Sequence, residues 1–267
     1  MTPPVDPDGA APDVARQLVL DGAEPPAALR ALAARLAPGT ALTPLWRNEL
    51  GGWTVRLDTG TAPARSAQVS LVLKWVPAAT RAAWPDEPSL ADEARRLEWL
   101  AGRHPAPELV AAGVSDDGDE YLLTRALTGE SAVTERWRAE PRTAVRVLGE
   151  SLRALHESLS AADCPFPCTA PLGPALPTDP EPRASDRVVV HGDACAPNTL
   201  LDARGALLAH VDVGALGVGD RWLDLAAGAQ SLAWNYGPGF EPLYFAAYGV
   251  DPDEERLAAW RRRWNHD

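Results

Sequence analysis

Acidic and amide side chains recur at fixed spacings in the second half of the chain. An apolar run leads into the tripeptide HGD, which ends at Asp193; Asn198 follows five residues later and Asp212 nineteen residues later. Strand-like runs at 199–201 and 207–211 would bring these side chains to neighbouring strand ends. Carboxylate and amide oxygens are hard ligands of the kind that Mg²⁺ takes, with phosphate and water oxygens completing its shell. The spacing therefore predicts a magnesium–phosphate site.

The alternative is that these residues only form the turns of a hairpin, as Asp and Asn commonly do. The two spacings, taken together with the placement of the strands, argue against it. A further acidic stretch, Asp220 to Asp224, opens the next helical segment and could brace the loop by capping that helix.

The same residues carry a resemblance. HGD-x4-N followed by a strand ending in D-x-G resembles the eukaryotic-like kinase fold, and HGDACAPN with the continuation G-x-L-G-V-x-D-R-x-x-D-L-A is similar to the aminoglycoside 3'-phosphotransferases. The resemblance implies that Asp193 is the catalytic base that orients the acceptor hydroxyl. It implies that Asn198 and Asp212 hold Mg²⁺, and that His191 is a structural brace for the catalytic loop.

A kinase of this fold also needs a strand lysine that reaches the α- and β-phosphates and a helical glutamate that holds it. LVLKW places Lys74 inside an apolar strand, where an unpaired amine is costly. By resemblance its partner is Glu93, at the start of the next helix. Glu98 is a rival that lies deeper in that helix. The other interpretation of Lys74 is a strand residue whose amine reaches solvent.

Further nucleotide contacts are expected, those of Arg125 and Leu127 by the same resemblance. Gly51 and Gly52 would let the backbone approach the phosphates, although two glycines also suit an ordinary hairpin turn. Thr54 could add a hydroxyl contact. The run YLLTRALTGES looks like the hinge between lobes, where the backbones of Arg125 and Leu127 would bond the adenine edge. The expected cofactors are ATP or GTP, with Mg²⁺.

The elements around these residues predict an α+β, bilobal, protein-kinase-like fold. After a short helix ending near Gly39, the chain to residue 126 follows the order β-β-β-α-β-β, with strands expected at 45–48, 53–57, 68–76, 108–114 and 120–126 and a helix at 89–101. Helices are expected over 141–159, 219–234 and 253–264, and five prolines exclude regular structure from 170–186. We expect an N-terminal extension at 1–40, a nucleotide-binding β lobe with one helix at 41–126, a mostly helical catalytic and substrate-binding lobe at 127–267, and a cleft between the lobes.

The parts that would recognise the acceptor depart from the family pattern. Only a short Pro-rich linker precedes HGD, where the family's aminoglycoside kinases have a longer helical segment. Trp234 and Asn235 stand where the family has acidic residues that bind substrate amines, and Ala215 and Gln230 stand where it has arginines. Trp234, Asn235 and Tyr236 are the candidate substrate residues; the aromatic rings suit a sugar or an apolar ring, or simply core packing.

Composition limits the partners. The chain has 267 residues, 46% of them hydrophobic, and a formal charge of −12 from 25 basic and 37 acidic residues. Nucleic acid is disfavoured because phosphate contacts need clustered Lys and Arg, whereas a cationic substrate is compatible. Cys164, Cys168 and Cys195 indicate free thiols rather than a disulfide framework. With no signal-peptide pattern and no membrane-length apolar run, we expect a cytoplasmic protein. A monomer or weak dimer is the expected oligomeric state.

Three functions are compatible with these sequence features. The first is a phosphotransferase of the antibiotic-resistance type, acting on a hydroxyl of an aminoglycoside or related amino sugar. The second is a kinase of another metabolite alcohol on the same fold. The third is a nucleotide-binding protein without catalysis, which the complete set of five kinase residues argues against. A protein kinase is disfavoured, because no long activation segment follows Asp212.

Overall fold

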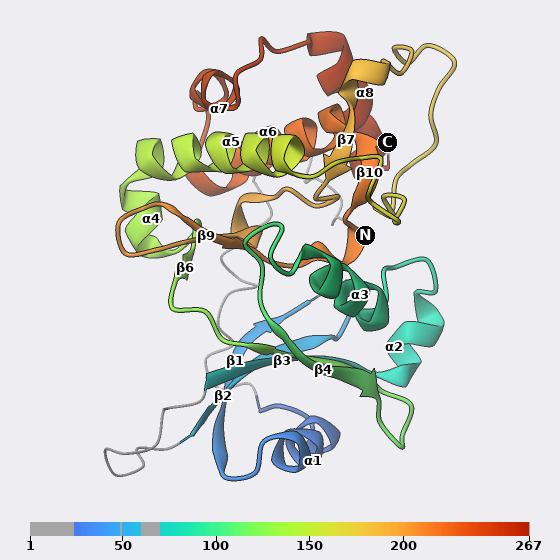
Figure 1. Cartoon of the computed structure of the whole chain (residues 1–267), viewed down its shortest axis with the longest axis vertical. Coiled ribbons are helices and arrows are strands. Elements are labelled where there is room, and N and C mark those ends of the chain that lie inside the picture. The colour runs from blue at the N-terminus through green and yellow to red at the C-terminus, as the bar shows by residue number, and fades with distance from the viewer. Residues whose placement is uncertain (1–23, 49, 60–69, 267) are drawn as a thin grey trace. The chain divides into compact units, whose positions relative to one another are not determined.

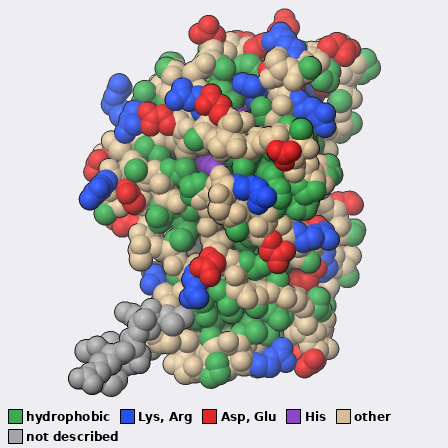
Figure 2. All heavy atoms as spheres, in the orientation of Figure 1, with side chains coloured by type: hydrophobic (Ala, Val, Ile, Leu, Met, Phe, Trp, Pro, Cys, Tyr) green, Lys and Arg blue, Asp and Glu red, His purple; other side chains and the backbone are tan. Residues whose placement is uncertain are grey.

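The computed structural model describes residues 24–48, 50–59 and 70–266. They form two compact units. Residues 24–98 and 107–127 make up the first, here called the β unit, and residues 99–106 and 128–266 make up the second, the helical unit. Within these ranges no helix is long and apolar enough to span a membrane. Acidic and basic side chains are interspersed over the face shown in Figure 2.

The β unit is built on a five-stranded antiparallel sheet in the order β1-β2-β3-β5-β4 (Figure 1). Its strands are β1 (Thr40–Arg47), β2 (Trp53–Thr59), β3 (Ser70–Val76), β4 (Leu109–Val114) and β5 (Glu120–Arg125). Strand β1 begins five residues before the predicted run at 45–48 and contains Pro44. An edge strand tolerates a proline, and the β1–β2 register shifts there.

Helices α1 (Ala27–Leu36) and α3 (Leu90–Leu100) lie on opposite faces of this sheet (Figure 1). Leu29 and Leu32 of α1 join the alternate residues of β2 and β3 in one apolar core. Because side chains alternate along a strand, Leu73 and Trp75 face that core and Lys74 points to the other side. A short helix that the sequence did not indicate, α2 (Ala78–Ala83), follows β3.

The helical unit contains α4 (Glu135–Ala139), α5 (Pro141–Ser158), α6 (Arg221–Tyr236), α7 (Glu241–Tyr248) and α8 (Glu254–Asn265). Helices α4 and α7 were not predicted, because each is too short to show helical periodicity. Helix α7 packs on α5 at Gly149, where a Cβ atom would lie 2.5 Å from the Tyr244 carbonyl oxygen.

Short strands carry the loops of this unit. β7 (Arg187–Val190) pairs with β10 (Gly217–Asp220), while β8 (Thr199–Leu201) lies between β6 (Glu130–Ser131) and β9 (Leu207–His210). Strands β6 and β10 were not predicted. The Pro-rich linker has no helix or strand over 170–183, but a short 3₁₀ turn, Ala184–Asp186, occupies the end of the range 170–186 that was expected to lack regular structure. An ion pair between Asp179 and Arg262 holds the linker to α8.

Candidate functional site

The HGD loop leaves β7 and is held by the side chain of its own histidine. The backbone N–H of Asp193 donates to His191 Nδ1 at 3.2 Å, so Nδ1 carries no proton. The proton therefore lies on Nε2, which donates to the Val211 carbonyl oxygen at 3.0 Å. A single buried imidazole thus ties the loop of Asp193 to the residue that precedes Asp212, which is a bracing arrangement.

Asp224 holds the same loop from the side of α6. Its carboxylate is fully buried and accepts the backbone N–H groups of His191 at 2.6 Å and Gly192 at 2.9 Å, while His156 Nε2 lies 3.0 Å away. Of the acidic stretch expected to cap α6, Asp220 does so by accepting the Trp222 N–H at 2.9 Å. The sequence did not predict that Asp224 braces the loop through direct hydrogen bonds, or that His156 contacts Asp224. The D-R-x-x-D-L-A pattern was the available signal for Asp224.

Asp193, Asn198 and Asp212 lie together in the helical unit. Asn198 Nδ2 donates to the Asp193 carbonyl oxygen at 3.0 Å, which leaves the amide oxygen as the atom suited to a cation. Burial raises the pKa of Asp193, and the neighbouring Asp212 carboxylate raises it further. Asp212 adopts the left-handed region, with φ 61° and ψ 48°, a conformation that Asp tolerates better than most residues.

These donors fit a hard dication. The carboxylates of Asp193 and Asp212 repel each other, and a cation held by Asn198 and Asp212 would reduce that repulsion. In the described ranges no group of three or more His, Cys, Asp or Glu residues is arranged to hold a metal by itself. Asn198 and Asp212 offer two oxygen ligands, so a metal held by them would take its remaining ligands from phosphate and water, as Mg²⁺ does.

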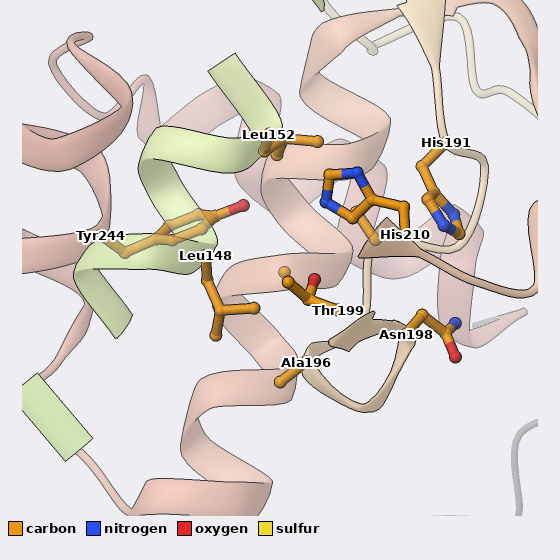
Figure 3. A pocket seen from close by; sticks show the side chains of 10 residues that line it. Leu148, Leu152, His191, Ala196, Asn198, Thr199, His210 and Tyr244 are labelled. Atoms are coloured by element: carbon orange, nitrogen blue, oxygen red, sulfur yellow. The ribbon is translucent and has the colours of Figure 1, made fainter. Parts of the chain in front are cut away.

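A small cavity lies behind the loop, enclosed by α5, α6, α7 and β9 (Figure 3). The side chains of Leu148, Leu152, His210 and Tyr244 converge on it, as Figure 3 shows. Its interior is only about the size of one water molecule, so it is too small for a nucleotide or a sugar. The cavity belongs to the packing that supports the loop.

Two buried histidines pair beside this cavity. His104 Nε2 and His210 Nδ1 are 2.8 Å apart, so one donates to the other. Burial and the nearby His191 lower the pKa of His104 from 6.5 to about 4. The imidazole therefore stays neutral in the folded protein at pH values where it would be protonated in the unfolded chain.

We expect the free energy of unfolding to fall as the pH drops from 6.5 to about 4. In that window His104 becomes protonated in the unfolded state but stays neutral in the folded state, which favours unfolding. Below pH 4 His104 is protonated in both states, and the free energy of unfolding falls no further on its account. A shift of about 2.5 pKa units corresponds to roughly 3 kcal/mol. Urea unfolding at pH 7.5 and pH 4.5 measures it. The variant His104→Asn should show a weaker pH dependence, whereas His266→Asn, at an exposed position, should behave like the wild type; equal slopes in all three would contradict the assignment.

In the β unit Lys74 and Glu93 form a two-pronged ion pair. Lys74 Nζ lies 2.7 Å from Glu93 Oε1 and 2.8 Å from Oε2. The lysine side chain is 22% exposed and the glutamate 6%, so the amine is fixed near a surface rather than extended into solvent. The rival Glu98 is exposed. The side-chain alternation of β3 and the first turn of α3 bring this pair together.

The other predicted nucleotide residues surround the same sheet. Gly51 has φ +92°, and the N–H of Gly52 donates to Asn48 Oδ1 at 2.6 Å, which closes the turn before β2. Thr54 lies opposite Lys74 in the β2–β3 register. The N–H of Arg125 already donates to the Glu108 carbonyl oxygen, so an adenine edge would have to use the carbonyl of Arg125. Leu127, which follows β5, is half-buried.

The candidate substrate residues lie near the end of α6. Trp234 is half-buried. Tyr236 donates its hydroxyl to the Ala132 carbonyl oxygen at 2.6 Å, and burial raises its pKa. Asn235 differs from the expectation, because it is only 8% exposed and its amide is used inside the unit. The expectation followed sequence position alone, which does not fix the direction in which a helical residue points.

The sequence of this chain is similar to those of known phosphotransferases. A sequence profile of the phosphotransferase enzyme family matches residues 53–176 and 169–260. Streptomycin 3''-kinase of Streptomyces griseus is 30% identical over 265 residues, covering 82% of this chain and 93% of the relative. An aminoglycoside 3'-phosphotransferase of Streptomyces fradiae is 35% identical over 211 residues, covering 64% of this chain and 77% of the relative.

A solved structure gives the same result. The crystal structure of aminoglycoside-3'-phosphotransferase of type VIII has 28% sequence identity and a TM-score of 0.70, and the match covers 88% of this chain and 96% of that chain. The profile alone spans more than half of the chain. The chain belongs to the phosphotransferase enzyme family.

Proposed function

We propose that this phosphotransferase moves the γ-phosphate of ATP or GTP onto a hydroxyl group of an aminoglycoside or a related amino sugar. The observation that carries the proposal is that both sets of phosphoryl-transfer residues are complete. The β unit has the Lys74–Glu93 ion pair, and the helical unit has Asp193 together with Asn198 and Asp212. Phosphoryl transfer depends mainly on positioning and charge compensation, which these groups can supply.

Each residue then has a distinct role. Lys74, held by Glu93, binds the α- and β-phosphates. Asp193 orients the acceptor hydroxyl and takes its proton as that oxygen bonds to the γ-phosphorus and the bond to the β-phosphate oxygen breaks. Asn198 and Asp212 would hold Mg²⁺, which when bound compensates the phosphate charge.

The acceptor class rests on two observations. The relatives of this chain are named for aminoglycosides and streptomycin, which are hydroxylated polyamines. The chain itself has a net charge of −12, which favours the approach of a cationic substrate. A kinase of another metabolite alcohol is the second candidate, because Trp234 offers an aromatic face where a carboxylate would serve a polyamine.

The test is a steady-state panel of aminoglycosides, neutral sugars and simple alcohols, with ATP and GTP as donors. Transfer to at least one aminoglycoside is expected, and the position of the new phosphate is read by NMR. Phosphate transfer to neutral alcohols alone would contradict this proposal and support the second candidate, a kinase of another metabolite alcohol. Nucleotide binding with no transfer to any acceptor would overturn it altogether.

Within the aminoglycosides we expect a narrow range, with poor turnover of kanamycin. Each well-formed charged contact contributes roughly 1.5–3 kcal/mol, so a tryptophan in place of one carboxylate at position 234 weakens binding about tenfold or more. Trp234→Glu is expected to lower the KM for polyamines, while Trp234→Gln, which has the same shape as Glu without the charge, should not. Efficient turnover of several aminoglycosides by the wild type, with KM in the micromolar range, would contradict this expectation.

A further inference from the structure

One face of α6 lies directly against the catalytic loop. Asp224, Gly228, Ser231 and Asn235 are spaced by four, three and four residues, so they form a single stripe along the helix. All four are buried. At Gly228 a Cβ atom would lie 2.3 Å from the Tyr244 hydroxyl and 3.4 Å from the carbonyl oxygen of Ala194, the residue after Asp193. The stripe is therefore in close contact with the loop along its length.

Ser231 binds the far end of the loop. Its hydroxyl oxygen accepts the backbone N–H of Ala196 at 2.9 Å, and the residue is only 1% exposed. Ala196 begins the single helical turn that ends at Asn198. The loop is thus fixed to α6 at two places, by Asp224 at its start and by Ser231 two helical turns later, with Asp193 between them.

Asn235 in turn fixes Ser231. Its Nδ2 donates to the Ser231 carbonyl oxygen at 2.8 Å and to the Ser231 hydroxyl at 3.2 Å. Arg138 of α4, whose guanidinium can only donate, lies 3.4 Å from Asn235 Oδ1. The arginine therefore sets which end of the amide faces Ser231.

The thiol of Cys195 lies between this stripe and Asp193. Burial raises the pKa of Cys195 well above its usual value, and the Asp193 carboxylate raises it further. The thiol therefore stays protonated and adds no negative charge beside the base.

We propose that Ser231 and Asn235 are positioning residues for phosphoryl transfer, which act by holding the catalytic loop at Ala196 and so fixing Asp193 and Asn198. This inference rests on the proposed function for its catalytic consequence, but its structural part does not. This role needs no contact with the substrate, because both residues are buried and bond to other residues of the helical unit.

The test compares Ser231→Ala with Ser151→Ala. Ser151 is a matched control, because it is also a buried helical serine, but among the described residues its hydroxyl bonds to Leu148 of its own helix alone. Ser231→Ala is expected to lower kcat about 10- to 100-fold with little change in the KM for nucleotide, as a small displacement of a catalytic group does. Ser151→Ala should keep the wild-type kcat. Equal kcat values in the two variants would overturn the inference.

Asn235→Ala separates positioning from substrate contact. If Asn235 acts through Ser231, Asn235→Ala lowers kcat in the wild-type background and has no further effect in Ser231→Ala. Additive effects, or a rise confined to the KM of the acceptor, would overturn the positioning role.

A second readout does not depend on activity. Hydrogen exchange over residues 191–199 is expected to be at least about tenfold faster in Ser231→Ala than in wild type or Ser151→Ala. Unchanged exchange would overturn the inference. Faster exchange in a protein that phosphorylates no acceptor would support the loop anchor and reject the proposed function, so the two failures are distinguishable.

Discussion

Asp193→Asn should lower turnover by about 10²–10⁴-fold while leaving nucleotide binding nearly unchanged, because an amide keeps the shape of the base but cannot accept the proton. Asp193 suits this role through its position, fixed at its N–H by His191 and at its carbonyl oxygen by Asn198. The measurement is kcat with the best acceptor of the panel, alongside calorimetric titration of the nucleotide.

Asp251→Asn is the matched control, since it makes the same chemical change at an exposed position. It should retain wild-type kcat. A wild-type rate in Asp193→Asn would remove this residue from the mechanism, whereas a parallel loss of nucleotide affinity would indicate that Asp193 belongs to the metal site instead.

Asp212→Ala should abolish the magnesium dependence of nucleotide binding. The variant removes the carboxylate expected to be the main ligand of the dication, so the charge of the triphosphate stays uncompensated. Titration of ATP with and without Mg²⁺ measures the effect. In the wild type we expect Mg²⁺ to strengthen ATP binding, and in the variant the two titrations should coincide.

The backbone of Asp212 requires a second variant. Its left-handed conformation costs an alanine roughly 1–2 kcal/mol, whereas Asn adopts it with little strain. Asp212→Asn therefore removes the charge and keeps the fold of the loop. If both variants lose the magnesium effect, the carboxylate is responsible; if Asp212→Asn keeps it in full, the metal assignment is wrong.

Local sequence determined the parts of this protein that depend on neighbours along the chain. The apolar run LVLKW predicted a strand that contains Lys74, and the period of two residues in a strand puts Lys74 on the face opposite to Leu73. The apolar run that ends in HGD predicted a loop after a strand. The five prolines excluded regular structure from 170–183, although not from the last three residues of the predicted range 170–186. The α+β kinase-like fold followed from such elements in order, because each is specified by a period of two or 3.6 residues.

Tertiary structure alone decided the contacts between distant residues. Helix packing decides that Lys74 pairs with Glu93 rather than Glu98. It also brings the Asp224 carboxylate to the backbone N–H groups of His191 and Gly192, and it buries Asn235. Helical periodicity fixes which residues share a face, but the direction of that face is set by non-local packing, which no local pattern encodes. For that reason the sequence placed Asn235 with the substrate, whereas packing turned it toward Ser231 and the catalytic loop.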